Sequence, residues 1–145
     1  MAVPINISPE TAVEITALPY SQTLDVSDAP TGTGNTPCTG TPYNAVWYRY
    51  TPPEGVTFVY VNADLAPGAD VSFTPACSVW TGTPSALTAY VIPQAGTDSE
   101  FCSRLLGGFY FRMPVVPGTT YYMQVTQDAA GPIASGALLL FRVSV

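Results

Sequence analysis

The acidic side chains are the groups of this sequence that could carry acid–base chemistry, because it contains no histidine and no lysine. Without histidine, neither a Ser-His-Asp nor a Cys-His catalytic arrangement can form within the chain. Paired carboxylates can hydrolyse glycosidic bonds. Three close pairs occur, namely Asp25 with Asp28, Asp64 with Asp70, and Asp98 with Glu100. Aspartate in turns commonly accepts hydrogen bonds from its own backbone, and we favour that role. We therefore expect no catalytic residue and no enzymatic activity.

The cysteines, the acidic residues and the absence of histidine also decide which metal or cofactor sites the sequence predicts. The three cysteines, Cys38, Cys77 and Cys102, lack the close paired spacing of a zinc site, and no imidazole is present. Calcium prefers oxygen-rich loops. Asp64 and Asp70 are therefore candidate calcium ligands, as an alternative to a purely structural role in turns. No glycine-rich phosphate loop precedes a helix. The sequence predicts no cofactor.

The cysteines allow two interpretations. Three is an odd number, so at least one thiol stays free or pairs between chains. Cys77 lies in an expected strand and Cys102 in the loop after the next one, which makes a Cys77–Cys102 disulfide geometrically plausible. Alternatively, all three are small buried hydrophobic residues, and we favour this second interpretation slightly.

The aromatic residues raise the hypothesis of a carbohydrate site. Nine tyrosines and two tryptophans in a small β protein could include a platform on which a sugar ring stacks. Large aromatic side chains more often pack in or across sheets, and we expect that role for Trp47 and Trp80. Tyr43 and Tyr90 border turns, so they are the candidates for binding residues.

The charge balance excludes several classes of partner. Four arginines face ten carboxylates, and the formal net charge is −6. A nucleic acid or an anionic membrane surface requires a basic patch, so neither partner is expected. The longest apolar run, residues 137–141, is too short to span a membrane. Residues 1–15 also lack the basic and apolar regions of a secretory signal.

The pattern of elements predicts an all-β fold. Fifteen prolines and twelve glycines divide the chain into short segments rich in β-branched and aromatic residues, and no helical stripe of useful length lies between them. Residues 45–60 read as two strands joined by the turn 51–55, a hairpin-like connection. We expect one domain over residues 1–145, with residues 1–11 as an N-terminal extension, and long loops at 28–42 and 93–103. Strands are expected at 12–18, 21–26, 46–50, 58–61, 71–74, 77–81, 87–92, 109–113, 120–126 and 139–145.

The ten segments amount to nine or so short strands, and they carry a series of landmarks that resembles a known family. The landmarks are ALPYSQTLDVS, NAVWYRYTPPEG, CSVWTGTPSAL, VPGTTYYMQVT and a closing SGALLLFRVSV. In this order they resemble the bacterial pre-peptidase C-terminal (PPC-like) domain over about residues 12–145. Residues 64–81 depart from the family pattern, because they lack its compact aspartate-bearing turn. The resemblance implies a jelly-roll-like antiparallel β-sandwich that serves as an accessory module of secreted hydrolases or of phage virion proteins.

Two classes of function follow from the composition and the resemblance. The first is a non-catalytic structural or adhesive module, best described as a phage virion accessory protein such as a capsid decoration or minor tail protein. Its partners would be other virion or structural subunits, with a cell-surface glycan as a further partner, and it would be oligomeric or assembled in a particle. The alternative is a carbohydrate- or protein-binding accessory domain of a secreted hydrolase. The expected location is the virion in the first case and extracellular in the second.

Overall fold

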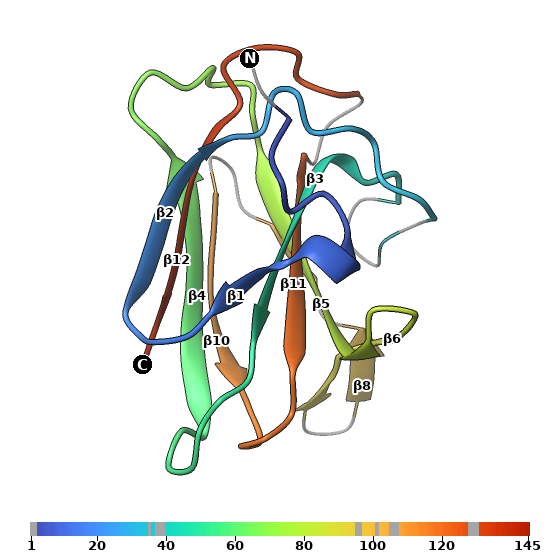
Figure 1. The fold of residues 1–145 in the computed structure, drawn as a ribbon, viewed down its shortest axis with the longest axis vertical. Coiled ribbons are helices and arrows are strands. Elements are labelled where there is room, and N and C mark those ends of the chain that lie inside the picture. Colours follow the sequence, from blue (N-terminus) through green and yellow to red (C-terminus); the bar gives the residue numbers. More distant parts are fainter. Residues whose placement is uncertain are drawn as a thin grey trace.

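A computed structural model describes residues 3–34, 36, 40–94, 97–100, 102–104, 108–127 and 131–145, with the backbone alone between 91 and 108. Two main β-sheets pack face to face and form a sandwich (Figure 1). The described residues contain no α-helix, only the short 3-10 helix η1 (Pro9–Thr11). The prediction of a jelly-roll-like, antiparallel all-β sandwich is therefore confirmed.

The first sheet has six strands. Its order is β1 (Val13–Ile15), β3 (Tyr43–Tyr50), β11 (Tyr121–Gln127), β5 (Pro75–Thr83) and β6 (Ala86–Ala89), and β9 (Cys102–Arg104) also pairs with β5. Every pairing in this sheet is antiparallel except that of β1 with β3, which is parallel. The N-terminal strand thus lies on the edge of the sheet beside β3.

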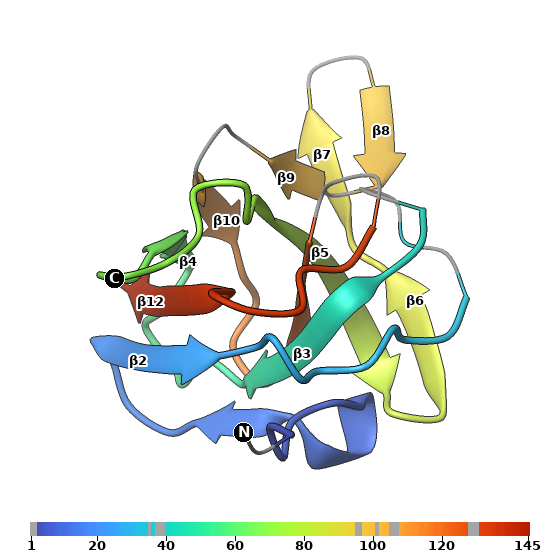
Figure 2. The same ribbon diagram turned by 90° about the horizontal axis from the view of Figure 1, so that it is seen from above.

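The second sheet has four antiparallel strands. Its order is β10 (Gly108–Pro114), β4 (Phe58–Leu65), β12 (Leu138–Ser144) and β2 (Tyr20–Asp25). A separate two-stranded ribbon, β7 (Val91–Gln94) with β8 (Thr97–Glu100), lies beside the sandwich (Figure 2).

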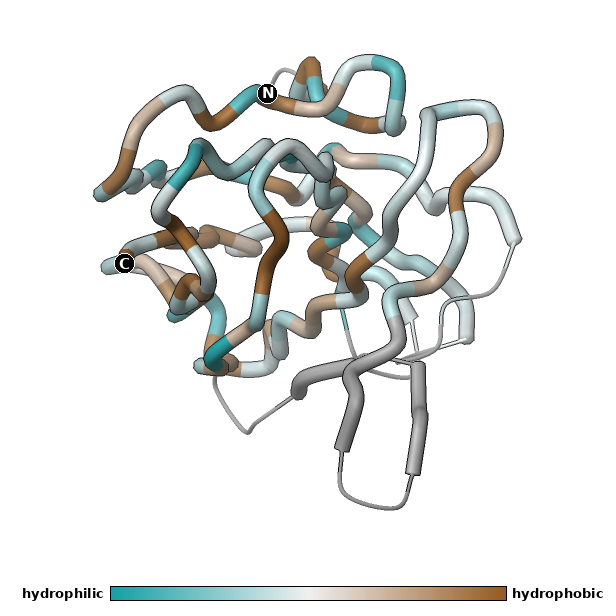
Figure 3. Tube along the Cα trace, turned by 90° about the horizontal axis from the view of Figure 1, so that it is seen from below, coloured by the Kyte–Doolittle hydropathy of each residue, from teal (hydrophilic) through white to brown (hydrophobic). Residues whose placement is uncertain are grey.

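The core lies between the inner faces of the two sheets. Side chains alternate between faces along a strand, and hydrophobic stretches, shown in brown, are interspersed with hydrophilic ones along the chain (Figure 3). The predicted inner residues of β11 and most of those of β12 are buried, namely Tyr121, Met123, Val125, Leu139, Phe141 and Val143, whereas Val145 is 65% exposed. Tyr48 of β3 stacks on Phe141 of β12 with ring centroids 4.1 Å apart, so aromatic packing joins the two sheets.

The turn after β3 does not form the predicted hairpin. β3 belongs to the six-stranded sheet and β4 to the four-stranded sheet, so the chain crosses from one sheet to the other over residues 51–57. The alternation of side chains and the strand propensity of the two segments are the same in a hairpin and in such a crossing, so the sequence does not distinguish them. The two prolines of this turn lack an N–H group, and the Pro52 carbonyl accepts a hydrogen bond from Gly118 N at 2.9 Å instead.

Two further expectations about single elements are wrong. Residues 71–74 form no strand, with a turn at 71–72, and Pro75 begins β5 instead of separating two strands. Proline is accepted as the first residue of a strand, where its missing N–H is not needed. The expected loop 93–103 contains the end of β7, all of β8 and the start of β9, because polar residues such as those of β8 can also form backbone pairs with a neighbouring strand.

Candidate functional site

The outer face of the six-stranded sheet is buried at its centre. Trp47 of β3, Gln124 of β11 and Ser78 of β5 are direct neighbours across three adjacent strands. They alternate with core residues, so their side chains point away from the second sheet. All three are nevertheless buried, with exposed fractions of 7%, 3% and 0%. Other segments of the chain must therefore cover this face.

The N-terminal segment forms one wall over this face. Asn6 donates from Nδ2 to the Trp47 carbonyl at 2.9 Å, and Trp47 N donates to the Asn6 carbonyl at 2.8 Å. This pair of bonds fixes the segment to the middle of β3. Immediately after it, Ser8 and Thr11 bond to one another through their hydroxyls at 3.0 Å, which shapes the turn that leads into β1.

The loop between β2 and β3 forms the second wall. Gly32 N donates to the Pro42 carbonyl at 2.9 Å, and a Cβ on Gly32 would lie 3.1 Å from the Pro42 ring. At the base of the loop, Asn44 adopts a positive φ of 51° and is 2% exposed. Its amide donates to the carbonyls of Val26 and Ile133 and accepts from Ile133 N. The buried Asn44 side chain thus connects the start of β3 to the segments around Val26 and Ile133 through hydrogen bonds.

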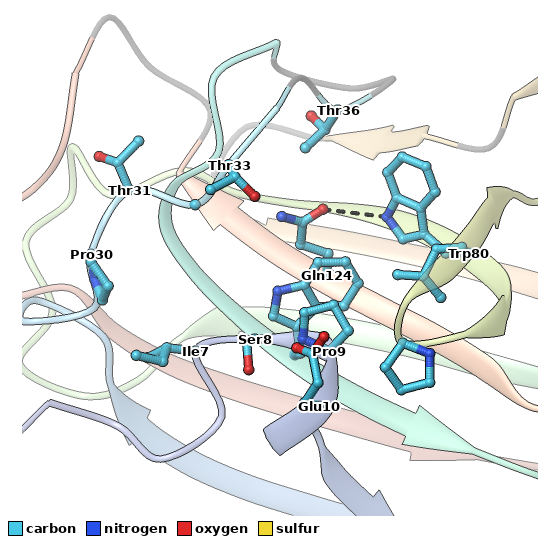
Figure 4. A pocket seen from close by; sticks show the side chains of 14 residues that line it. Ile7, Ser8, Pro9, Glu10, Pro30, Thr31, Thr33, Thr36, Trp80 and Gln124 are labelled. Carbon is cyan, nitrogen blue, oxygen red and sulfur yellow. Dashed lines mark hydrogen bonds between the residues drawn. The ribbon is translucent and has the colours of Figure 1, made fainter.

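Between these walls lies a pocket of about 430 Å³ (Figure 4). Its floor is the outer face of the six-stranded sheet, and the turn between β5 and β6 closes its far side. Its size falls within the usual range for small-ligand sites. The lining residues are Ile7, Ser8, Pro9, Glu10, Pro30, Thr31, Gly32, Thr33, Thr36, Trp47, Trp80, Pro84, Leu87 and Gln124.

Gln124 is the most buried polar side chain of the pocket. Its Oε1 accepts a hydrogen bond of 3.3 Å from the indole nitrogen of Trp80, and Figure 4 shows the two side chains facing one another across the floor. This bond fixes the orientation of the amide, and within the described part of the chain its Nε2 group has no hydrogen-bond partner. The half-buried Trp80 ring and the buried Trp47 ring add aromatic surface to the site.

We expected Trp47 and Trp80 to pack in or across the sheets, but neither belongs to the core cluster, and both line the pocket on the outer face of the six-stranded sheet. Tyr90, one of the two predicted binding residues, packs on the core and meets Tyr121 edge to face at 5.5 Å. Its hydroxyl donates to the Pro114 carbonyl at 2.7 Å, and burial raises its pKa. Tyr43, the other one, is half-buried at the start of β3. Neither tyrosine lines the pocket.

The two candidate calcium ligands have separate partners. Asp64 forms an ion pair with Arg142 on the outer face of the four-stranded sheet. Asp70 accepts bonds from the backbone and hydroxyl of Ser72, which lower its pKa. Among the described residues, no group of three acidic, cysteine or histidine side chains could hold a metal ion.

The remaining carboxylate pairs are partly described. Asp25 accepts a bond from Ser27 N at 2.9 Å, the turn role favoured from the sequence. The side chains of Asp98 and Glu100 lie outside the described part of the chain.

Cys77 is a free, buried thiol. The register places Ser103 opposite Cys77, and Cys102 pairs with Ser78 one position away, so the alternative of a Cys77–Cys102 bridge, which we disfavoured slightly, has no directly opposed pair of cysteines. Burial raises the pKa of the Cys77 thiol. Cys38 and the Cys102 side chain lie outside the described residues.

The outer face of the four-stranded sheet carries a second group of functional candidates. Phe58, Tyr60, Tyr110, Arg112 and Arg142 lie side by side on β4, β10 and β12, and we call them the aromatic–arginine face. The rings of Tyr60 and Tyr110 stack with centroids 5.7 Å apart, and the Arg112 guanidinium lies 4.2 Å from the centre of the Phe58 ring. Tyr110 is 58% exposed.

No protein-family model matches the chain, and a search of curated proteins also finds no match. None of the described helices is long and apolar enough to cross a membrane. Sequence reasoning missed the pocket because its walls come from segments far apart in the chain. The alternation of β11 did carry a signal, since it places Gln124 on the face opposite Met123 and Val125.

Proposed function

We propose that this chain is a non-catalytic structural or adhesive module that binds protein subunits of a larger particle through its aromatic–arginine face. The observation that carries the proposal is the exposure of that face. On the six-stranded sheet the outward residues Trp47 and Gln124 are covered, whereas on the four-stranded sheet Tyr110 and Arg112 are exposed. Tyrosine and arginine are enriched in the centres of protein–protein interfaces.

The charges on this face support a protein partner. Arg112 and Arg142 are two of the four cations in a chain of net charge −6. Arg142 is already held by Asn62 and Asp64, with Nε 3.0 Å from the Asn62 oxygen, so it is oriented before a partner arrives. A pre-oriented guanidinium loses less side-chain freedom on binding.

The more specific proposal is an accessory role in a phage virion, as a capsid decoration or minor tail protein. It rests on the resemblance of the strand landmarks to PPC-like domains. The alternative, an accessory binding domain of a secreted hydrolase, is favoured by the pocket on the opposite sheet. Neighbouring reading frames distinguish the two, because virion genes would flank the first and a hydrolase would read through into the second.

Copurification with released particles tests the proposal. The chain should co-migrate with particles on a density gradient, and the double variant Tyr110→Ser/Arg112→Ser should lose most of that association. Val71→Ser is the matched control, since Val71 is 87% exposed in a loop outside the aromatic–arginine face. Absence of the wild-type chain from particles would overturn the virion role. Equal association of the double variant would overturn the choice of face.

A further inference from the structure

We infer that the pocket on the six-stranded sheet binds a neutral sugar. The inference is independent of the aromatic–arginine face, because its residues lie on the outer side of the other sheet. Gln124 is 3% exposed, and in the described part of the chain its Nε2 donors have no partner. Among the described residues, the buried side-chain atoms without a partner are Arg49 Nε, Ser78 Oγ and Thr126 Oγ1 and not this amide. The Nε2 group is therefore accessible from the pocket, where an acceptor on a ligand can replace water.

The pocket contains further polar groups besides Gln124. The Trp47 indole N–H is a donor only, and it too has no partner among the described residues. The hydroxyls of Ser8, Thr31 and Thr33 can donate or accept, and Glu10 can accept. A ligand that matches this set must present acceptors to the floor and donors to the rim. Sugar hydroxyls do both.

Part of the pocket lining is apolar. The half-buried Trp80 ring, with Pro84 and Leu87 beside it, forms an apolar side of the pocket. A pyranose ring has an apolar C–H face with hydroxyls around its edge, so it can stack on an indole while its edge bonds to an amide (Figure 4). The combination of one aromatic platform and a fixed amide matches that shape.

The charge of the pocket lining favours neutral ligands over acidic ones. Among the described residues, no arginine lines the pocket, and Glu10 brings a carboxylate to the rim. An acidic sugar or a phosphorylated ligand would meet that carboxylate without a compensating cation. A proline-rich peptide would stack on the tryptophan, but its backbone has few N–H donors for Glu10 and the rim hydroxyls. A neutral hexose or N-acetylhexosamine fits both conditions.

Intrinsic fluorescence provides a direct test, because both tryptophans of the chain line the pocket. Gluco-, manno-, galacto- and N-acetylglucosamine oligosaccharides should be titrated, with sialylated and proline-rich peptide probes in parallel. We expect at least one neutral oligosaccharide to change the emission in a saturable way. The variant Trp80→Ala should bind it about tenfold or more weakly through loss of the stacking surface.

Matched variants separate binding from folding. Gln124→Met keeps the volume of the side chain but removes its donors, and we expect it to reduce affinity with an unchanged circular dichroism spectrum. Tyr110→Ala on the opposite sheet should bind the sugar as the wild type does. If no neutral sugar binds, if a peptide binds instead, or if Trp80→Ala and Gln124→Met keep full affinity, the assignment is overturned. None of these outcomes bears on copurification through the aromatic–arginine face.

Discussion

Single buried amides hold the connecting segments of this protein in place. Asn44 bonds to Val26 and Ile133, and Gln127 accepts from Thr74 N at 2.7 Å while it donates to the Ser72 carbonyl. Both side chains are at most 2% exposed. Backbone groups outside strands need partners when they are buried, and here side chains supply those partners.

Substitution of Asn44 should separate its hydrogen bonds from its backbone conformation. Asn44→Gly keeps the positive φ but removes the bonds, so we expect a loss of about 2–3 kcal/mol in the free energy of unfolding. Asn44→Ala should cost about 1 kcal/mol more, because alanine disfavours that φ. Urea denaturation measures both values. A glycine variant as stable as the wild type would contradict the role of the amide.

The buried Cys77 thiol and Tyr48 hydroxyl should make the fold sensitive to alkali. Burial raises the pKa of both groups above their ordinary values. Their stabilising contribution is complete below about pH 8.5, where an unfolded thiol is protonated. It is lost as pH rises, since the unfolded state then binds fewer protons than the folded state. The expected decrease in the free energy of unfolding is up to about 1.4 kcal/mol per pH unit for each group.

Thermal melts between pH 7 and pH 11 check this expectation. Cys77→Ala should show a shallower decrease than the wild type from about pH 8.5 to 10, where the thiol titrates before tyrosine does. Identical pH profiles for the two proteins would show that the Cys77 thiol does not contribute.

At the scale of elements, the N-terminal segment is a wall of the pocket and not a free extension. Residues 3–11 cover the outer face of β3, and β1 continues along the edge of that strand. The ion pair between Glu14 and Arg49, at 3.2 Å, joins the two strands on the same face. Both partners are substantially exposed, so the pair contributes little stability, and the bonds of Asn6 are the stronger attachment.

The variant Asn6→Ala tests that attachment. It leaves the buried Trp47 carbonyl without its side-chain donor, so we expect a loss of about 1–3 kcal/mol. The Trp47 amide should exchange with solvent faster, because the segment opens more often. Val3→Ser is the control, since Val3 is exposed in the same segment. Hydrogen exchange that is unchanged at Trp47 in Asn6→Ala would show that other contacts hold the segment.

For the whole molecule, the sequence predicts which face of a strand is buried better than it predicts which strands pair with one another. Alternation identifies the inner residues of β11 and β12 because burial follows a period of two along each strand. It does not say that 58–65 pairs with β12 and β10, since pairing depends on segments about fifty to eighty residues away. The pocket is less predictable still. Its walls lie near residues 8, 32 and 85, and no local pattern links them to Gln124.

The two outer faces of the sandwich point in opposite directions, and this has a consequence for many copies held together. A chain attached through the four-stranded sheet presents its six-stranded sheet outward. When several copies are fixed on one particle, each bound sugar raises the effective concentration of the next pocket near the same surface. Many weak sugar contacts would then together give strong attachment of the particle. A monomeric copy would dissociate from a glycan surface to which an array of copies stays bound.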